Sequence, residues 1–173
     1  MSASESYSFL TTKGVLKLNL INAAEPNNGR MLYKVSLFLE DKNLTDAYFG
    51  NWPYVNYYLA KYNAFSTDGN WFYIPKENEH FLINATLEKI LLPSISLSAA
   101  TFIGNSFFDD CLFVFTYEEI LSKNLQTENV SKFRISEEKI YFKEVVIVDS
   151  KSIKAILSNG LTKFFSFDLR ELP

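Results

Sequence analysis

The last third of the chain repeats one pattern of short apolar segments, and this repetition constrains the fold more than any other feature. The stretch from Cys111 to Leu169 holds two copies, each with three short apolar segments separated by polar residues. The segments span 112–115, 120–124 and 130–135 in the first copy and 145–148, 153–157 and 161–167 in the second. Short apolar runs bounded by polar turns are typical of antiparallel strands. We therefore expect three antiparallel strands in each copy.

Two more strand units precede these copies. Residues 15–20 alternate apolar and polar side chains, and 31–39 form a second apolar run, so both segments are predicted to be strands. The turn residues of Glu25–Gly29, which include Pro and Asn-Gly, join them into a predicted hairpin over 15–39. A three-strand unit is expected at 71–74, 80–84 and 87–92. Residues 96–102 are interpreted as a further strand before a turn at 104–106, and residues 1–8 are expected to be disordered.

The spacing of the units bears on the architecture. The strands that open the four units end at residues 39, 74, 115 and 148, which lie 35, 41 and 33 residues apart. Such spacing is typical of β-propellers, but strands also recur about every 8–12 residues in a β-sandwich. The sequence therefore predicts a mainly β fold, with antiparallel sheets from about four hairpin or three-strand units. The arrangement is propeller-like or an incomplete propeller, with a β-sandwich as the alternative.

The two C-terminal copies, 112–135 and 145–167, resemble blades of β-propeller proteins. The polar segment Leu125–Asn129 is similar to the tight turn that joins two outer strands of such a blade. The resemblance implies a scaffold of radially repeated sheets. It implies no particular activity, because one fold supports many unrelated functions.

Size and charge narrow the classes of protein to consider. A chain of 173 residues is most simply one domain, 1–173. Residues 1–92 hold 8 basic and 9 acidic side chains, and residues 93–173 hold 9 and 11, so neither half has the basic excess of a nucleic-acid binder. No apolar run approaches the ~20 residues of a membrane helix. With one cysteine and a polar start, the chain is expected to be cytoplasmic, without nucleic-acid or membrane partners.

The segment 48–73 interrupts the strand pattern and is unusually aromatic, with 11 of the chain's 28 aromatic residues. Pro53 can begin a helix, because the first helical position needs no N–H. We therefore predict one short helix near 54–63, with Trp52, Val55, Leu59 and Tyr62 on one face. These aromatics either cover an open end of a sheet or form a binding surface, since Tyr and Trp are enriched at interface hot spots.

The residues capable of chemistry form no recognisable catalytic or metal motif. His80, the one histidine, begins an apolar segment and is interpreted as structural or exposed at the surface. Cys111 follows two aspartates, which would raise the pKa of its thiol and oppose nucleophilic use. Three acidic doublets, at 109–110, 118–119 and 137–138, are interpreted as solvated turns that can also steer a basic partner if they gather on one rim. No cofactor or metal is predicted.

These observations predict a non-enzymatic protein-binding module with one protein partner, with a homodimer as a further alternative. In general character, the small acidic chain resembles the immunity proteins that neutralise bacterial toxins, which implies a tight complex with a basic toxin domain. The predicted anchors are Trp52, Tyr54, Tyr57 and Tyr58, and the predicted charged rim is Asp109, Asp110, Glu118 and Glu119. The alternative is a small-molecule or glycan-binding domain. A carboxylate-dependent hydrolase is one version of this alternative.

Overall fold

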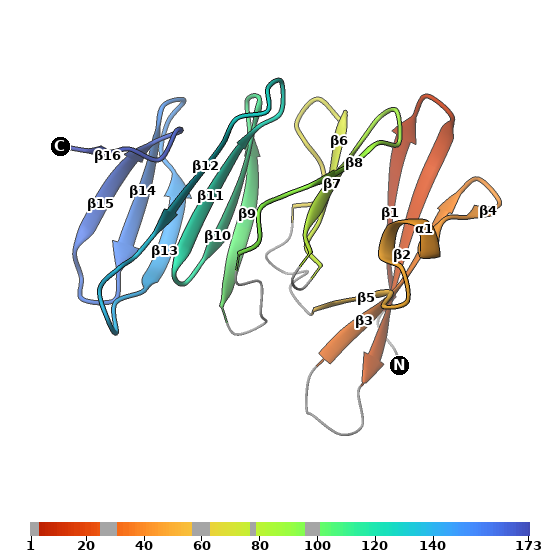
Figure 1. Ribbon diagram of the computed structural model, residues 1–173, viewed down its shortest axis with the longest axis horizontal. Helices are drawn as coiled ribbons and strands as arrows, with labels where there is room; N and C mark the ends of the chain where they lie inside the picture. The colour runs from red at the N-terminus through yellow and green to blue at the C-terminus, as the bar shows by residue number, and fades with distance from the viewer. Residues whose placement is uncertain (1–3, 25–30, 57–62, 77–78, 96–100) are drawn as a thin grey trace. The chain divides into compact units, whose positions relative to one another are not determined.

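The computed structural model describes residues 4–24, 31–56, 63–76, 79–95 and 101–173. In these ranges the chain forms strands β1 to β16 and one short helix, α1, arranged as four antiparallel sheets (Figure 1). The predicted mainly β fold is thus confirmed. The four antiparallel sheets that the described residues form agree with both predicted arrangements, the incomplete propeller and the sandwich.

The contacts between residues divide the chain into two compact units. Unit 1 comprises residues 1–57 and 64–94, and unit 2 comprises 58–63 and 95–173. Each unit contains two sheets with a core of its own. That residues 1–173 form a single domain stays a prediction.

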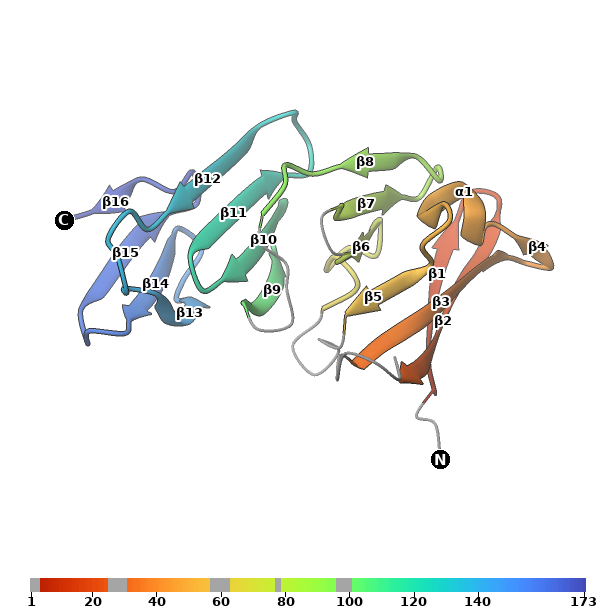
Figure 2. The same cartoon turned by 60° about the horizontal axis from the view of Figure 1, so that its bottom comes forward.

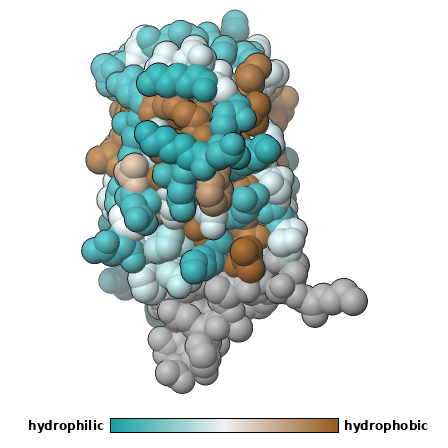
Figure 3. All heavy atoms as spheres, turned by 90° about the vertical axis from the view of Figure 1, so that its right-hand side faces the viewer, coloured by the Kyte–Doolittle hydropathy of each residue, from teal (hydrophilic) through white to brown (hydrophobic). Residues whose placement is uncertain are grey.

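The first sheet of unit 1, sheet A, is built on the predicted hairpin, whose turn at 25–30 lies outside the described residues. Its strands are β1 (Ser4–Thr11), β2 (Gly14–Ala24), β3 (Met31–Leu39), β4 (Lys42–Asn43) and β5 (Tyr54–Asn56). Leu16, Leu18 and Leu20 are buried on its inner face, because side chains alternate between the two faces of a strand. Lys17 lies on the outer face, and the side of unit 1 that carries β1 to β4 is largely hydrophilic with scattered apolar residues (Figure 3).

The expectation of disorder over residues 1–8 is wrong for residues 4–8. These residues begin β1 and pair with β2 from Ser4 opposite Ile21 to Ser8 opposite Lys17. The exposed serines of this segment gave it the polar composition of a disordered terminus. The strand forms because its backbone completes the edge of β2 and because Phe9, on the opposite face, is buried.

The predicted helix at 54–63 is also wrong in its first residues. Tyr54–Asn56 is strand β5, which pairs with β3, and the N–H of Val35 donates to the carbonyl of Pro53 (2.8 Å). Sheet pairing therefore outweighs the helix-starting tendency of Pro53. Residues 57–62 lie outside the described residues. The helix that is present, α1, spans Thr45–Phe49 and ends at Gly50, whose φ of 60° suits glycine.

The second sheet of unit 1, sheet B, confirms the predicted three-strand unit. Its strands follow one another as β6 (Trp71–Ile74), β7 (Phe81–Asn84) and β8 (Lys89–Leu91). Sheets A and B pack through aromatic rings: Phe65 stacks on Phe9 of β1 and on Phe72 of β6, with ring centroids 6.0 and 5.1 Å apart. These stacked rings thus join the two sheets of unit 1.

Unit 2 contains the two repeated copies as sheets C and D, each a meander of four consecutive strands (Figure 2). Sheet C is β9 (Phe102–Phe108), β10 (Cys111–Thr116), β11 (Glu119–Asn124) and β12 (Val130–Arg134). Sheet D is β13 (Phe142–Ile147), β14 (Ser152–Leu157), β15 (Thr162–Ser166) and β16 (Glu171–Leu172). Their facing sides enclose a core that includes Phe113, Phe142 and Phe165, all fully buried.

One strand of unit 2 is displaced from its predicted position. Gly104, Asn105 and Ser106 lie in the middle of β9 and not in a turn, while residues 96–100 lie outside the described residues. The side chain of Asn105 exchanges two hydrogen bonds with the backbone of Asn63, at 2.9 and 2.7 Å. Asn105 thus satisfies the backbone N–H and C=O groups of Asn63 from within a strand.

Two lysines hold the C-terminal end of α1. Lys76 donates to the carbonyl of Phe49 (2.9 Å) and Lys89 to that of Tyr48 (3.0 Å), so carbonyls at the last turn of the helix gain cationic partners. Glu79 binds both amines, with Oε1 2.6 Å from Lys89 and Oε2 3.6 Å from Lys76. The hydrogen bond from Lys89 is the main reason that the pKa of Glu79 is lowered.

This network predicts a pH-dependent contribution to stability. Because the pKa of Glu79 is lower in the folded chain, its contribution is present above the unfolded value near 4.5 and is lost as the pH falls through the folded value. Glu79→Gln should therefore lower the urea midpoint at pH 7 and lower it less at pH 3. The same substitution at Glu128, an exposed turn residue of unit 2, serves as the control. An equal effect of Glu79→Gln at both pH values would contradict this account.

Candidate functional site

Two of the four predicted anchors lie together on the surface of unit 1. The rings of Trp52 and Tyr54 are 4.8 Å apart at 50° to each other, and Trp52 is 50% exposed. The carbonyl of Pro53, between them, accepts a hydrogen bond from β3, so the backbone that carries the pair is attached to sheet A. Tyr57 and Tyr58, the other two predicted anchors, lie outside the described residues.

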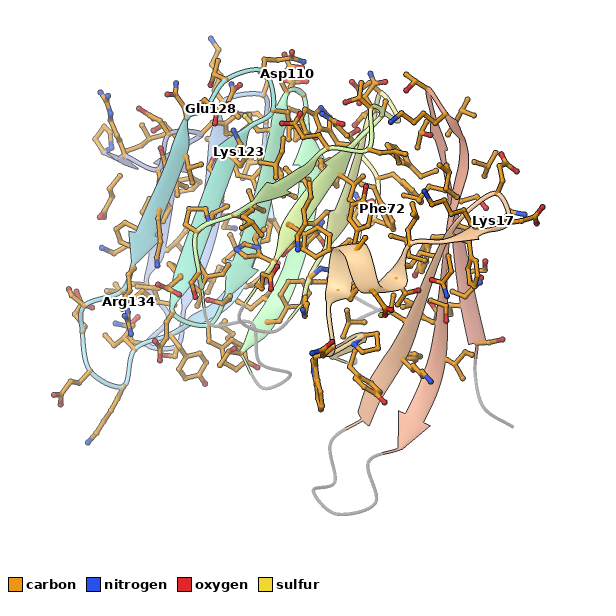
Figure 4. All side chains as sticks on the ribbon, turned by 45° about the vertical axis from the view of Figure 1, so that its right-hand side comes forward. Lys17, Phe72, Asp110, Lys123, Glu128 and Arg134 are labelled. Carbon is orange, nitrogen blue, oxygen red and sulfur yellow. The ribbon has the colours of Figure 1, made fainter. Side chains whose placement is uncertain are left out.

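The two acidic doublets of the predicted rim lie at opposite ends of one strand. Asp109 and Asp110 precede β10 and Glu118 and Glu119 follow its end, so the length of β10 separates them by about 20 Å at ~3.3 Å per residue. Figure 4 shows Asp110 and Arg134, the ion-pair partner of Glu118, at opposite ends of sheet C. The expectation that these doublets gather on one rim is therefore wrong.

The two residues of the second doublet also differ in exposure. Glu119 is buried, with a side chain only 6% exposed, and its carboxylate lies 2.9 Å from the amine of Lys132. Glu118 is exposed and pairs with the guanidinium of Arg134 at 3.1 Å. Glu119 thus has a structural role in sheet C, and Glu118 is the member of the doublet that a partner can contact.

A second exposed aromatic pair lies in unit 2, where the sequence had not indicated one. Tyr117 follows β10 and Tyr141 precedes β13, and their rings are 5.4 Å apart. They are 38% and 44% exposed. Both tyrosines lie outside the aromatic segment 48–73 and are 24 residues apart in sequence, so only the folded chain brings the pair together.

Backbone hydrogen bonds hold both tyrosines in place. The N–H of Tyr117 donates to the Thr101 carbonyl (2.7 Å), and the Tyr117 carbonyl accepts from Phe142 (2.7 Å). The Tyr141 carbonyl accepts from the N–H of Ser158 (2.9 Å). The turn that carries Tyr117 is tight, because the Thr116 hydroxyl accepts from the Glu119 N–H at 2.9 Å. The pair is thus preorganised by sheets C and D together.

The two tyrosines line a hollow that we call the tyrosine cleft. Its volume is ≈ 370 Å³, and its charged lining residues are Glu118, Arg134, Glu137, Glu138 and Lys139. The cleft therefore unites one predicted rim residue, Glu118, with the third acidic doublet. Aromatic faces beside carboxylates and a guanidinium can hold a protein side chain or a small polar ligand.

His80 has a structural role. It is fully buried, and its Nε2 lies 2.7 Å from the Pro93 carbonyl, which can only accept a hydrogen bond. Nε2 therefore carries the proton, and Nδ1 accepts from the Tyr73 hydroxyl at 3.0 Å. Both ring nitrogens thus tie β6 and β7 to the chain after β8.

Neither the cysteine nor the carboxylates form a catalytic or metal cluster in the described part of the chain. Burial raises the pKa of the Cys111 thiol, and Asp110 and Asp109 raise it further, as the sequence predicted for the two aspartates. Across the described ranges, no three His, Cys, Asp or Glu side chains are placed to share a metal ion. The tyrosine cleft and the Trp52–Tyr54 pair are exposed aromatic surfaces that a partner or ligand can contact.

The doublet at 118–119 offers a matched pair of substitutions. Glu119→Ala should lower the free energy of unfolding by about 1–3 kcal/mol, because it removes a buried carboxylate and leaves Lys132 without this ion-pair partner. Glu118→Ala should change it by less than about 0.5 kcal/mol, because its ion pair is exposed to solvent. Urea unfolding followed by circular dichroism measures both. Equal losses would refute the distinction between a structural and an accessible carboxylate.

No protein-family model, curated protein or solved structure matches this chain. The resemblance to propeller blades and to immunity proteins therefore stays a prediction. Within the described residues, no helix has the length and apolar character needed to cross a membrane.

Proposed function

We propose that this chain is a non-enzymatic protein-binding module that uses the tyrosine cleft as its main contact surface. The observation that carries the proposal is the pair of exposed, backbone-anchored rings of Tyr117 and Tyr141 beside Arg134. Tyrosine and arginine are among the residues that dominate binding energy at protein interfaces. Their apolar faces contribute contact area, and their polar atoms provide hydrogen bonds at the edge of the contact.

Preorganisation supports this use of the cleft. Ordering a mobile side chain at an interface costs about 0.5–1.5 kcal/mol. The backbone on both sides of the tyrosine pair is already bonded to neighbouring strands. A partner therefore meets a surface whose backbone is in place before binding. In unit 1, the Trp52–Tyr54 pair is a second surface of the same kind.

The narrower form of the proposal is an immunity-type protein that acts in the cytoplasm and neutralises a toxin in a tight one-to-one complex. The net charge of −3 and the acidic residues Glu137 and Glu138 at the cleft favour a basic partner. Binding of this kind requires no cofactor, because occlusion of the toxin's own active site suffices.

A small-molecule or glycan-binding function is the second candidate. The cleft volume of ≈ 370 Å³ falls within the range of about 300–1,000 Å³ typical of ligand sites. Tyrosine rings can stack on sugars, and the carboxylates can accept hydrogen bonds from hydroxyl groups. Thermal unfolding in the presence of sugars and nucleotides separates the candidates, since a ligand at 100 times its Kd stabilises a protein by about 2.7 kcal/mol.

The proposal predicts one stoichiometric protein partner whose binding depends on the cleft. Immobilised chain should capture this partner from the cell that produces it, and Tyr117→Ala/Tyr141→Ala should weaken the purified complex at least ~30-fold, as loss of hot-spot residues worth about 2 kcal/mol or more requires. Isothermal titration calorimetry with the captured partner measures the change in Kd.

Phe164→Ala is the matched control, since Phe164 is an aromatic residue of unit 2 with similar exposure that does not line the cleft. It should leave the Kd unchanged. Trp52→Ala/Tyr54→Ala tests the second surface in the same assay. A complex that tolerates the loss of both cleft tyrosines would exclude the cleft as the binding surface, and a stabilising sugar without any protein partner would favour the second candidate.

A further inference from the structure

Strand β13 is the edge of sheet D. The strand order is β13-β14-β15-β16, so among the described strands β13 is paired on one side only. At its start, the N–H of Phe142 donates to the Tyr117 carbonyl and closes the edge there. The stretch from Lys143 to Asp149, which we call the open edge, continues beyond this bond.

The backbone groups that point out of the open edge can be identified. In an antiparallel strand, residues bonded to one neighbour alternate with residues that face the other side. The N–H of Val148 donates to the Ser152 carbonyl at 3.0 Å, so Val148 and Val146 face β14. Val145 and Ile147 therefore present their N–H and C=O groups to the open edge.

The side chains of the open edge are unusual for an unpaired strand. Exposed edges are ordinarily protected by charges, proline or bulges. Here a bulge lies at the start, between Phe142 and Glu144, but residues 145–148 are four consecutive β-branched apolar residues. Val146 is 40% and Val148 54% exposed. Such a segment is suited to pairing with another strand.

A hollow lined by apolar side chains and by the polar residues Asn105, Ser106 and Asp149 lies beside the open edge. It has a volume of ≈ 420 Å³, and its lining includes Val145, Ile147, Ile103 and Phe115. A strand added to β13 would direct its inward side chains towards this hollow, because neighbouring strands of a sheet place side chains on the same faces.

We propose that the open edge pairs with the same strand of a second copy, antiparallel and with the two-fold axis at Val146. This register sets Val145 opposite Ile147 of the second copy, and the reverse. Both residues face the edge, so each of the two pairs exchanges two backbone hydrogen bonds. Two copies of the same strand thus form one continuous sheet, an isologous contact of the kind that most homodimers use.

Charge complementarity selects this register. With the axis at Val146, Lys143 lies opposite Asp149 of the second copy at both ends of the paired stretch. An axis at Ile147 would instead place Lys143 opposite Lys151, which is repulsive. An axis at Val145 would place Lys143 opposite Ile147, which carries no charge. Of these registers, only the axis at Val146 pairs opposite charges and brings the two Val146 side chains together.

The contact is small and of the size at which protein association is weak and concentration-dependent. Its backbone donors and acceptors are those of Val145 and Ile147, which are distinct from the charged residues of the tyrosine cleft. Dimerisation therefore does not depend on the partner proposed above.

Cysteine cross-linking tests the register. In a Cys111→Ser background, Val146→Cys should form an intermolecular disulfide with oxidised glutathione, because directly opposed residues without backbone bonds have Cα atoms about 4.5 Å apart. Val148→Cys is the matched control. Val148 is more exposed than Val146, but in this register it lies four residues, or about 13 Å along the strand, from Val148 of the second copy. The Val148→Cys variant should therefore form no intermolecular disulfide. Faster cross-linking at position 148 than at 146 would overturn the proposal.

Mass measurement tests the dimer itself. Multi-angle light scattering and sedimentation should show a mass rising with concentration from 19.9 kDa towards twice that value. Val146→Lys should keep the mass at that of the monomer, whereas Val130→Lys, the same change at an exposed valine of β12, should not. Circular dichroism verifies that both variants fold. A monomer mass at every concentration up to about 1 mM would refute the inference.

Discussion

Pairing between consecutive antiparallel strands is the interaction on which the rest of the structure depends. Each of the four sheets is built largely from neighbours in sequence, so backbone hydrogen bonds form between segments that are a short turn apart. A sheet made in this way still exposes an apolar face. Sheet A covers its face with sheet B through Phe9, Phe65 and Phe72, and sheet C covers its face with sheet D through the phenylalanines of unit 2.

The candidate contact surfaces lie at the ends and edges of these sheets. Tyr117 follows the buried strand β10 and Tyr141 precedes β13, and backbone hydrogen bonds to neighbouring segments hold both residues in place. An edge strand has backbone groups that its own sheet does not use, and β13 combines them with exposed valines. Contact surfaces thus arise from the ends and edges of sheets whose centres are occupied by the core.

Local pattern was sufficient to predict most strands. The units at 71–92, 112–135 and 145–167 were found because their apolar segments and polar turns follow each other directly in sequence. The errors occurred where a distant neighbour decided the conformation. Ser4–Ser8 is a strand because β2 is beside it, Tyr54–Asn56 is a strand because β3 is beside it, and Gly104–Ser106 is held within β9 by β10. No periodicity within these segments carries that information.

The candidate site likewise combines features that local sequence predicts with features that depend on packing. The acidic doublets and the turns that present them can be predicted from sequence, because turn chemistry is local. The sequence also places Trp52 near Tyr54, which are two positions apart. In contrast, it is the packing of the sheets that buries Glu119 against Lys132, leaves Glu118 in solvent and brings Tyr117 next to Tyr141. Burial and proximity depend on which faces the sheets bury, and that choice is made when whole sheets pack, not within any one segment.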